Sequence, residues 1–254
     1  MGHTAPDGAI QDRSHIVHGS NMKRLLFVLA ALLAAAPAFA QLDLSSLKYG
    51  VRAGVGIGSV DTSFDDEANK NLESTMTGGQ FTVGTFAELP VMQHLLVSAE
   101  VNFERTGIND RVKRVEIVDT GLMPVHVFTD TKTKFPISYI HIPVLAKYTF
   151  VRDALYVEAG PQIGFLVGKV NTHTETITTV NSVDTKTVAD SDDTDHIKKS
   201  HFALAIGWGF TLRQVSAGLR VGFGLDDIQA DAYKVDGCNV SHTDVQFAIR
   251  YSFR

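Results

Sequence analysis

Eight charged residues share the polar phase of alternating segments and could act on a substrate or on one another. Carboxylate pairs can supply the acid and the nucleophile or base of a glycosidase. The cationic members are Arg52, Lys147, Arg220 and Arg250, and the acidic members are Glu88, Glu100, Glu104 and Glu158. Since four cations balance four carboxylates, and buried charges are costly unless paired, we interpret the set as a structural salt-bridge network, not a catalytic site.

Two clusters of histidine and aspartate could hold a metal ion or support hydrolysis. One places His196 beside Asp192, Asp193 and Asp195, and the other places His242 near Asp226, Asp227 and Asp244. Neither has a recognisable metal-ligand spacing, so we interpret both as solvated loop charges. Cys238 is the only cysteine, which excludes an internal disulfide. We expect no metal and no cofactor.

The elements that must position these charges are segments in which apolar and polar residues alternate strictly. In residues 48–58 every odd position from Tyr49 to Ile57 is apolar, whereas the even positions are Lys, Gly and Arg. Seven further segments repeat the pattern, at 80–89, 95–105, 139–150, 155–168, 202–212, 215–223 and 245–253. Strands with lipid on one side and a polar lumen on the other have this period of two.

The links between the segments alternate in length. Short links at 89–94, 151–154 and 213–214 are separated by long ones at 59–78, 107–136, 169–199 and 226–243. Outer-membrane barrels have short periplasmic turns and long extracellular loops. The sequence therefore predicts an all-β fold, an eight-stranded antiparallel up-and-down transmembrane β-barrel with long extracellular hairpin loops.

Aromatic residues near the segment ends predict the two girdles of such a barrel. The expected periplasmic girdle is Tyr49, Tyr148, Phe150, Tyr251 and Phe253, and the expected outer girdle is Phe81, Phe103, Phe165, Phe202 and Phe223. A soluble β-sandwich or lipocalin-like barrel is the alternative, but its bulky apolar face would have to point inward.

The segment 22–40 has the order of a secretory signal peptide. Two basic residues follow Met22, an apolar run extends to Ala36, and the small-residue exit contains Ala38 and Ala40. We expect cleavage after Ala40, so that the mature chain begins at Gln41. Residues 1–21 are then an upstream mis-start or an unstructured extension, and residues 41–254 form the barrel domain.

Composition excludes two classes of protein. The formal net charge of −5 offers no basic face for nucleic acid. The mean hydropathy of +0.04 is too low for a helical membrane protein, and no apolar run after the signal segment is long enough to form a spanning helix. The expected surroundings are outer-membrane lipid, and the expected location is the cell outer membrane.

Three stretches carry a family resemblance: SYIHIPVLAKYTF, LYVEAGPQIGFLVG, and HFALAIGWGFTL followed by VSAGLRVGFGLDDI. They resemble the PorT-like outer-membrane β-barrel family of Bacteroidota-type bacteria over residues 41–254. His141 stands where that family usually has an acidic residue. The resemblance implies a signal peptide, a non-enzymatic barrel and an association with secretion, although the domain is shared by many proteins of other roles.

Two details of strand pairing follow from the turns and prolines. If a tight hairpin turns at Arg152 and Asp153, residues facing each other on the two flanking strands have numbers that sum to 305. This register sets Lys147 opposite Glu158. Pro143 and Pro161 cannot donate a backbone hydrogen bond, so we expect a bulge or a gap in the ladder there.

Three functions are compatible with these features. The first is a closed structural or interaction barrel that meets other envelope proteins through loops 107–136 and 169–199, which look like Thr-rich hairpins. The second is a narrow channel, favoured by the Gly-rich lumen faces of the first, sixth and seventh segments. The third is a membrane-embedded hydrolase or acyltransferase that uses loop residues such as His242. The sequence leaves the oligomeric state open.

Overall fold

The computed structural model describes residues 44–64, 74–119, 124–180, 183–230 and 238–253. The predicted extension 1–21, the signal segment 22–40 and Gln41 lie outside these residues. No helix in the described ranges has the length and apolar character needed to cross a membrane. The elements are η1 (Leu44–Ser46), β1 (Lys48–Phe64), β2 (Ser74–Met92), β3 (Leu95–Asp119), β4 (Pro124–Phe150), β5 (Leu155–Leu166), β6 (Asn171–Val180), β7 (Val183–Asp192), η3 (Thr194–His196), β8 (Ser200–Leu212), β9 (Val215–Gly224) and β10 (Cys238–Ser252).

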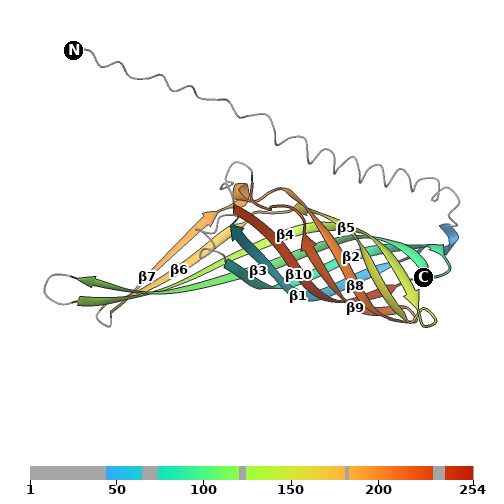
Figure 1. The fold of residues 1–254 in the computed structure, drawn as a ribbon, viewed down its shortest axis with the longest axis horizontal. Coiled ribbons are helices and arrows are strands. Elements are labelled where there is room, and N and C mark those ends of the chain that lie inside the picture. Colours follow the sequence, from blue (N-terminus) through green and yellow to red (C-terminus); the bar gives the residue numbers. More distant parts are fainter. Residues whose placement is uncertain (1–43, 65–73, 120–123, 181–182, 231–237, 254) are drawn as a thin grey trace, which may run out of the picture. The chain divides into compact units, whose positions relative to one another are not determined.

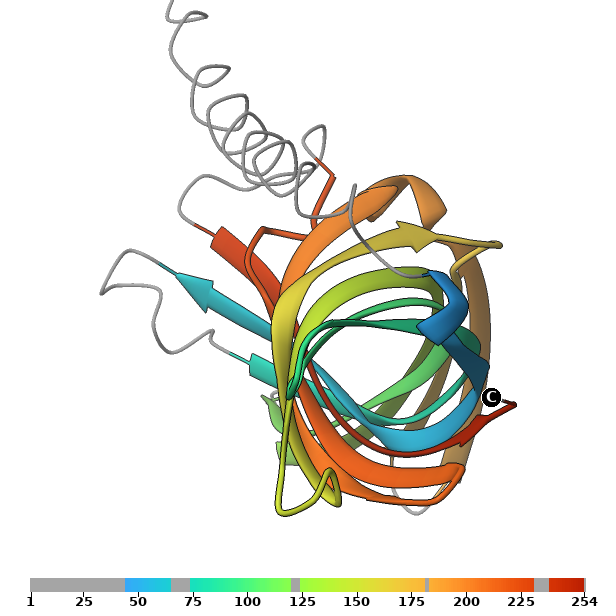
Figure 2. The same cartoon turned by 90° about the vertical axis from the view of Figure 1, so that its right-hand side faces the viewer.

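Eight of the strands close into an antiparallel barrel (Figures 1 and 2). Their order around the ring is β1, β2, β3, β4, β5, β8, β9 and β10, and β10 pairs with β1 to complete it. Tight turns join β2 to β3, β4 to β5 and β8 to β9 at one end, which we call the turn end. The predicted all-β, eight-stranded fold is confirmed, and closure leaves the ring without an unpaired edge.

Alternation within each strand sets which side chains face the interior. The apolar phase is exposed on the outside, as at Val55, Trp208 and Ile249. All ten residues of the two predicted aromatic girdles are likewise exposed. The polar phase is buried inside the ring, where a one-residue slip would exchange the two faces.

The pairing of β4 with β5 follows the register expected from the turn. Lys147 lies opposite Glu158, as predicted. The ladder has no pairs between Pro143–Gln162 and Ala146–Ala159, and the paired numbers sum to 305 on both sides. The expected irregularity is therefore a gap without a bulge. A register shift that the sequence did not indicate occurs between Pro90 and Met92, where β2 meets β3.

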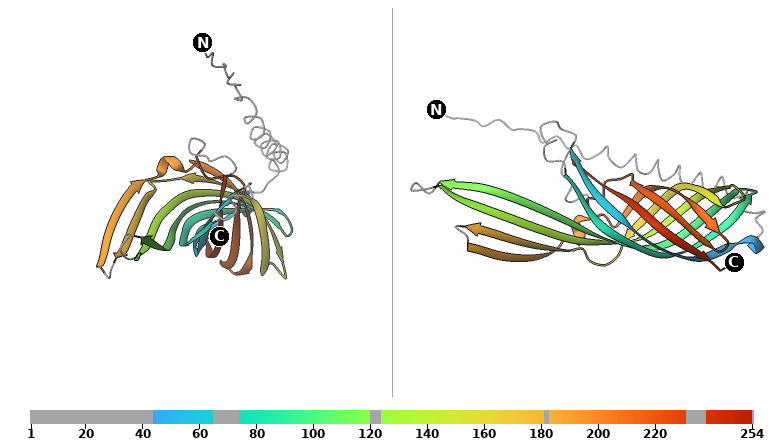
Figure 3. Two further views of the ribbon diagram at one scale, coloured as in Figure 1. Left: turned by 60° about the vertical axis from the view of Figure 1, so that its left-hand side comes forward. Right: turned by 90° about the horizontal axis from the view of Figure 1, so that it is seen from below.

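The long strands continue beyond the barrel at the end opposite the turns, which we call the hairpin end. There β3 and β4 pair as far as Asp119 and Pro124. Along the other edge of β4 the strand β6 is added, and β7 pairs with β6. The result is a four-stranded antiparallel sheet in the order β3, β4, β6, β7 (Figure 3). The hairpins expected in 107–136 and 169–199 are both present.

Candidate functional site

The lumen centre holds an ion cluster built from five strands, which we call the central ion cluster: Arg52, Glu100, Glu158, Arg220 and Arg250. Glu100 accepts hydrogen bonds from Arg220 Nη1 at 2.7 Å and Nη2 at 2.8 Å, and from Arg250 Nη2 at 2.6 Å. Arg52 Nη1 lies 3.5 Å from the same carboxylate. All five side chains are buried. One carboxylate therefore joins three guanidinium groups across the barrel.

Glu158 completes this cluster from the side of β5. Arg220 donates to Glu158 Oε1 through Nε at 3.0 Å and Nη2 at 2.6 Å, and Arg250 Nη2 lies 3.0 Å from both of its oxygens. Two arginines are thus shared by two carboxylates, an arrangement that neutralises charge locally and fixes the guanidinium planes.

A second ion pair lies nearer the turn end. Lys147 Nζ donates to Glu88 Oε1 at 2.7 Å, and Arg250 Nη1 reaches the same oxygen at 3.2 Å. The ammonium also lies 4.3 Å from the ring centre of Tyr156. Although Lys147 is opposite Glu158 in the ladder, its ion pair is with Glu88, two strands away. Backbone register and side-chain pairing therefore differ in a barrel interior.

On the hairpin side of the central ion cluster the lumen becomes a hydrogen-bonded mixture of amides, carboxylates and imidazoles. Gln246 accepts from Arg52 at 2.9 Å and donates to Glu104 at 2.6 Å and Asp244 at 2.8 Å. His141 Nδ1 lies 3.2 Å from Glu104 Oε2, and its Nε2 lies 3.0 Å from Nε2 of His201. Asp244 is a fifth inward carboxylate beyond the eight charges expected from sequence.

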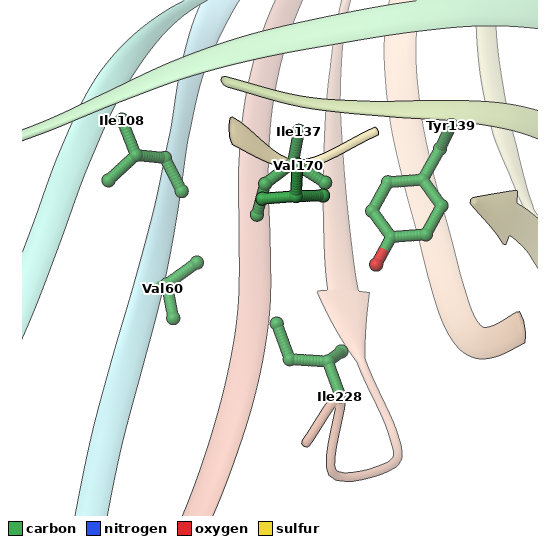
Figure 4. Packing of buried hydrophobic residues seen from close by; sticks show 6 residues of the cluster. All are labelled: Val60, Ile108, Ile137, Tyr139, Val170 and Ile228. Carbon is green, nitrogen blue, oxygen red and sulfur yellow. The ribbon is translucent and has the colours of Figure 1, made fainter. Parts of the chain in front are cut away.

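An apolar cluster closes the lumen at the hairpin end (Figure 4). The labelled residues are Val60, Ile108, Ile137, Tyr139, Val170 and Ile228. Val170 and Ile228 come from links outside the barrel strands. The link 193–199 donates backbone hydrogen bonds to both, from Asp193 to the carbonyl of Val170 at 2.9 Å and from Lys198 to that of Ile228 at 2.8 Å. This apolar cap was not predicted from the sequence.

The Gly-rich lumen faces provide the space that the long side chains fill. A Cβ on Gly207 would lie 2.9 Å from Glu158 Oε1, and one on Gly222 would overlap the carboxylate of Asp244. Such approaches are closer than van der Waals contact allows. The glycines of β8 and β9 are therefore complementary to carboxylates carried by β5 and β10.

Of the two histidine clusters, the one around His196 is exposed as expected, whereas the one around His242 is not. His242 belongs to β10 and is 4% exposed, with its ring 6.0 Å from that of His201 and 6.5 Å from that of Tyr139. The expectation that it is a solvated loop residue is wrong, because β10 begins earlier than the alternation indicated. His196 lies in η3, with Nδ1 3.4 Å from Asp193. In the described ranges no group of three His, Cys, Asp or Glu residues is arranged to hold a metal ion.

At the turn end lies a cavity of about 550 Å³ whose lining includes Glu88 and Lys147. At its rim Asp153 ties two turns together, accepting from Thr149 Oγ1 and contacting His94 Nδ1. Two hydrogen bonds hold the pKa of Asp153 below its usual range; the one from Thr149 has the larger effect and the one from His94 the smaller.

The sheet beyond the barrel has one face rich in charge and one rich in threonine. Arg111 pairs with Asp130 on the charged face, and Lys186 pairs with Glu175 at 3.0 Å. The hydrogen bond from Arg111 lowers the pKa of Asp130, and that from Lys186 lowers the pKa of Glu175. Because one partner of each pair is exposed and the other is partly exposed, each ion pair contributes little to stability.

Comparison with known proteins identifies the family. A family model described as outer membrane protein beta-barrel domain matches residues 39–230. No curated protein matches the chain.

Similar solved structures include three outer-membrane barrels. The attachment invasion locus protein Ail of Yersinia pestis is 10% identical, with 80% of this chain and 99% of that chain covered and a TM-score of 0.28. Neisserial surface protein A is 10% identical, with 80% and 97% covered and a TM-score of 0.31. The outer membrane protease OmpT from Escherichia coli is 6% identical, with 84% and 98% covered and a TM-score of 0.31. Since the family model spans most of the chain, the chain belongs to the outer membrane protein beta-barrel domain family and resides in the outer membrane.

Proposed function

We propose that this protein is a closed, non-enzymatic outer-membrane barrel whose lumen charges are structural and whose extracellular sheet makes its contacts with partners. The observation that carries the proposal is Glu100, which is 2% exposed and holds Arg220 and Arg250 by hydrogen bonds of 2.6–2.8 Å across the lumen. An eight-stranded barrel has an interior only wide enough for side chains, so such a cluster blocks passage.

Two further features support a closed lumen. The apolar cap around Ile108 and Val170 lies on the hairpin side, where an ion would have to lose its hydration to pass. The glycines that favoured a channel, such as Gly207, lie against carboxylates from other strands. Space beside the glycines is therefore occupied by the ion clusters.

The surroundings of the carboxylates support a non-enzymatic role. A glycosidase needs two carboxyl groups on either side of a substrate-binding cleft. Here Glu100 and Glu158 share Arg220 and Arg250, and Glu88 is held by Lys147. His242, which the hydrolase hypothesis used, is buried against aromatic and imidazole rings, away from the surface.

Ion conductance in planar bilayers tests the proposal. We expect purified, heat-modifiable protein to give no stable conductance of porin size. A porin reconstituted in the same bilayers is the positive control and shows that the assay detects an open barrel. A stable wild-type conductance that changes when Glu100 or Arg220 is neutralised would instead establish the narrow channel.

Export through segment 22–40 is part of this proposal. The Ala38–Phe39–Ala40 exit supports cleavage before Gln41. N-terminal sequencing of protein from outer-membrane fractions should then give a chain that begins QLDLSS. A chain that retains residues 22–40 in that fraction would contradict this route.

The resemblance to PorT-like barrels extends the proposal to secretion. It is carried by the Gly160–Pro161–Gln162 stretch of β5 and by the Tyr139–Lys147 region of β4. Deletion of the gene should then reduce the amount of exported protein in the culture medium. An unchanged set of secreted proteins would refute the role in secretion but would not affect the proposal of a closed barrel.

A further inference from the structure

The extracellular sheet has two free edges among the described residues. Beyond Asn109 the residues of β3 pair with β4 alone, because the ladder with β2 ends at the pair Thr77–Asn109. At the other edge β7 pairs along its whole length with β6 and with no other described strand. Each edge presents backbone N–H and C=O groups that can pair with another strand.

The strand directions decide which edges can join. The order β3, β4, β6, β7 is antiparallel at every step, so β3 runs away from the membrane and β7 runs toward it (Figure 3). Two copies in one membrane have the same orientation. Therefore β7 of one copy and β3 of its neighbour are antiparallel and can continue the ladder, whereas two β7 edges would be parallel.

Each edge carries a short run of charge, and the two runs have opposite sign. On β3 the exposed run from Arg111 to Arg114 contains three cations, with Lys113 between them. On β7 the run from Asp190 to Asp192 contains two carboxylates, both exposed. Pairing β7 with β3 places these unlike charges side by side. Opposite-charge cross-strand pairs of this kind stabilise a sheet.

One register keeps the faces of the two sheets continuous and sets the basic run of β3 against the acidic run of β7. The ladders place Lys113 opposite Asp130, Asp130 opposite Ile177 and Ile177 opposite Lys186, so Lys113 and Lys186 share a face of the sheet. Asp190 lies four residues from Lys186 and is on that face too. Setting Lys113 opposite Asp190 of the neighbour also sets Arg111 opposite Asp192.

Contacts within one copy leave these groups accessible. Asp190 pairs with His173 and Asp192 with Lys169, and all four side chains are substantially exposed. Exposed pairs of this kind are weak and can be shared with a second cation.

We propose that copies of this protein join side by side through their extracellular sheets, β7 of one copy pairing antiparallel with β3 of the next. The partner of the sheet is thus a second copy of the chain. This inference rests on the interaction role proposed above and names its partner. Because the contact joins two different edges, it can extend into rows of barrels.

Disulfide trapping tests the register directly. Chains carrying Lys113→Cys and chains carrying Asp190→Cys, distinguished by tags and made in a Cys238→Ala background, are expressed together and oxidised gently in outer-membrane fractions. Directly opposite residues have the short Cβ separation that a disulfide requires. We expect a mixed dimer that needs both variants.

The matched control moves one cysteine to the other face of β7. Ala189→Cys combined with Lys113→Cys changes the position by one residue, so its side chain points away, and we expect about a tenfold lower yield of mixed dimer. Every variant is first checked for the faster-migrating unboiled band that a folded barrel gives. Equal yields from the two combinations would overturn the register.

Charge exchange tests the association without cysteines. Lys113→Asp or Asp190→Lys alone should weaken association in vesicles, measured by energy transfer between labelled copies, by about fivefold. The two changes in the same chain restore opposite charges at the contact and should restore association. Failure of the double variant to recover would contradict the proposed pairing.

The outcomes separate this inference from the proposed function. Homodimers formed by Asp190→Cys alone would show that β7 meets β7, which overturns the inference. Disulfides to a protein of another mass, with none between copies, would also overturn it while the interaction role stands. A stable wild-type conductance would overturn the closed barrel and leave the sheet contact to be judged by its own test.

Discussion

Replacement of Glu100 by alanine should strongly destabilise the barrel. The side chain is 2% exposed and accepts hydrogen bonds from Arg220, Arg250 and Asn102, with Arg52 3.5 Å away. Its removal leaves Arg52 without a carboxylate partner among its described contacts, while Arg220 and Arg250 share Glu158 and Arg250 also reaches Glu88. The structure therefore predicts that unpaired positive charge, more than lost packing, determines the cost.

The size of the stability loss depends on the hydrogen-bond partners that each arginine keeps when Glu100 is removed. Arg220 and Arg250 keep Glu158, whereas Arg52 keeps only the amide of Gln246 among its described hydrogen-bond partners. Removing one partner of a buried ion pair costs about 3–5 kcal/mol, and we expect a loss of about 4 kcal/mol in the free energy of unfolding. Glu100→Gln keeps the volume and one acceptor oxygen, so its loss should be smaller, about 2 kcal/mol.

Urea unfolding from lipid vesicles measures this loss. Trp208 is the only tryptophan and is exposed on the outer face of β8, so its fluorescence reports removal from lipid. Glu116→Ala, at an exposed position of β3 beyond the barrel, is the control and should change stability by less than about 0.5 kcal/mol. A loss below about 1 kcal/mol for Glu100→Ala would refute the reasoning, because it would mean that water solvates the guanidinium groups.

Two further predictions concern pairs within the lumen. In a double-mutant cycle, Lys147→Met should couple to Glu88→Gln by more than about 1 kcal/mol and to Glu158→Gln by much less, since its 2.7 Å ion pair is with Glu88; equal couplings would contradict the observed pairing. Gly222→Ala should cost about 1–3 kcal/mol because the new methyl group meets the carboxylate of Asp244, and Asp244→Ala in the same chain should relieve part of that cost. Both are measured by the urea assay with Trp208.

The eight strands and their faces could be predicted because a period of two is a local property of the sequence. The turn at Arg152 and Asp153 then fixed the register of β4 on β5, including the pair Lys147–Glu158. Both inferences need only neighbouring segments. Lipid on one face and charge on the other leave a single acceptable phase for each strand.

Features that depend on the strand ends were missed. Val60 and Ile108 continue the inward phase of β1 and β3 but are apolar, so the interior changes from polar to apolar toward the hairpin end. This change was visible as apolar residues in the polar phase past residue 58. Likewise, Val240 to Asp244 alternate weakly, and His242 was therefore placed in a loop although it lies in β10.

Contacts across the lumen could not be predicted because they join strands that are not neighbours. Glu100 on β3 reaches Arg220 on β9 and Arg250 on β10, contacts that no hairpin register determines. The same cross-lumen contacts change the inference drawn from the glycines about an open lumen. Considered one strand at a time, Gly207 and Gly222 suggest an open channel. The barrel cross-section, however, is set by the number of strands. Long side chains from one wall can therefore fill the space that glycines leave at another. Glycines on β8 and β9 together with arginine and glutamate elsewhere therefore favour a filled lumen, in which added volume destabilises the fold instead of narrowing a pore.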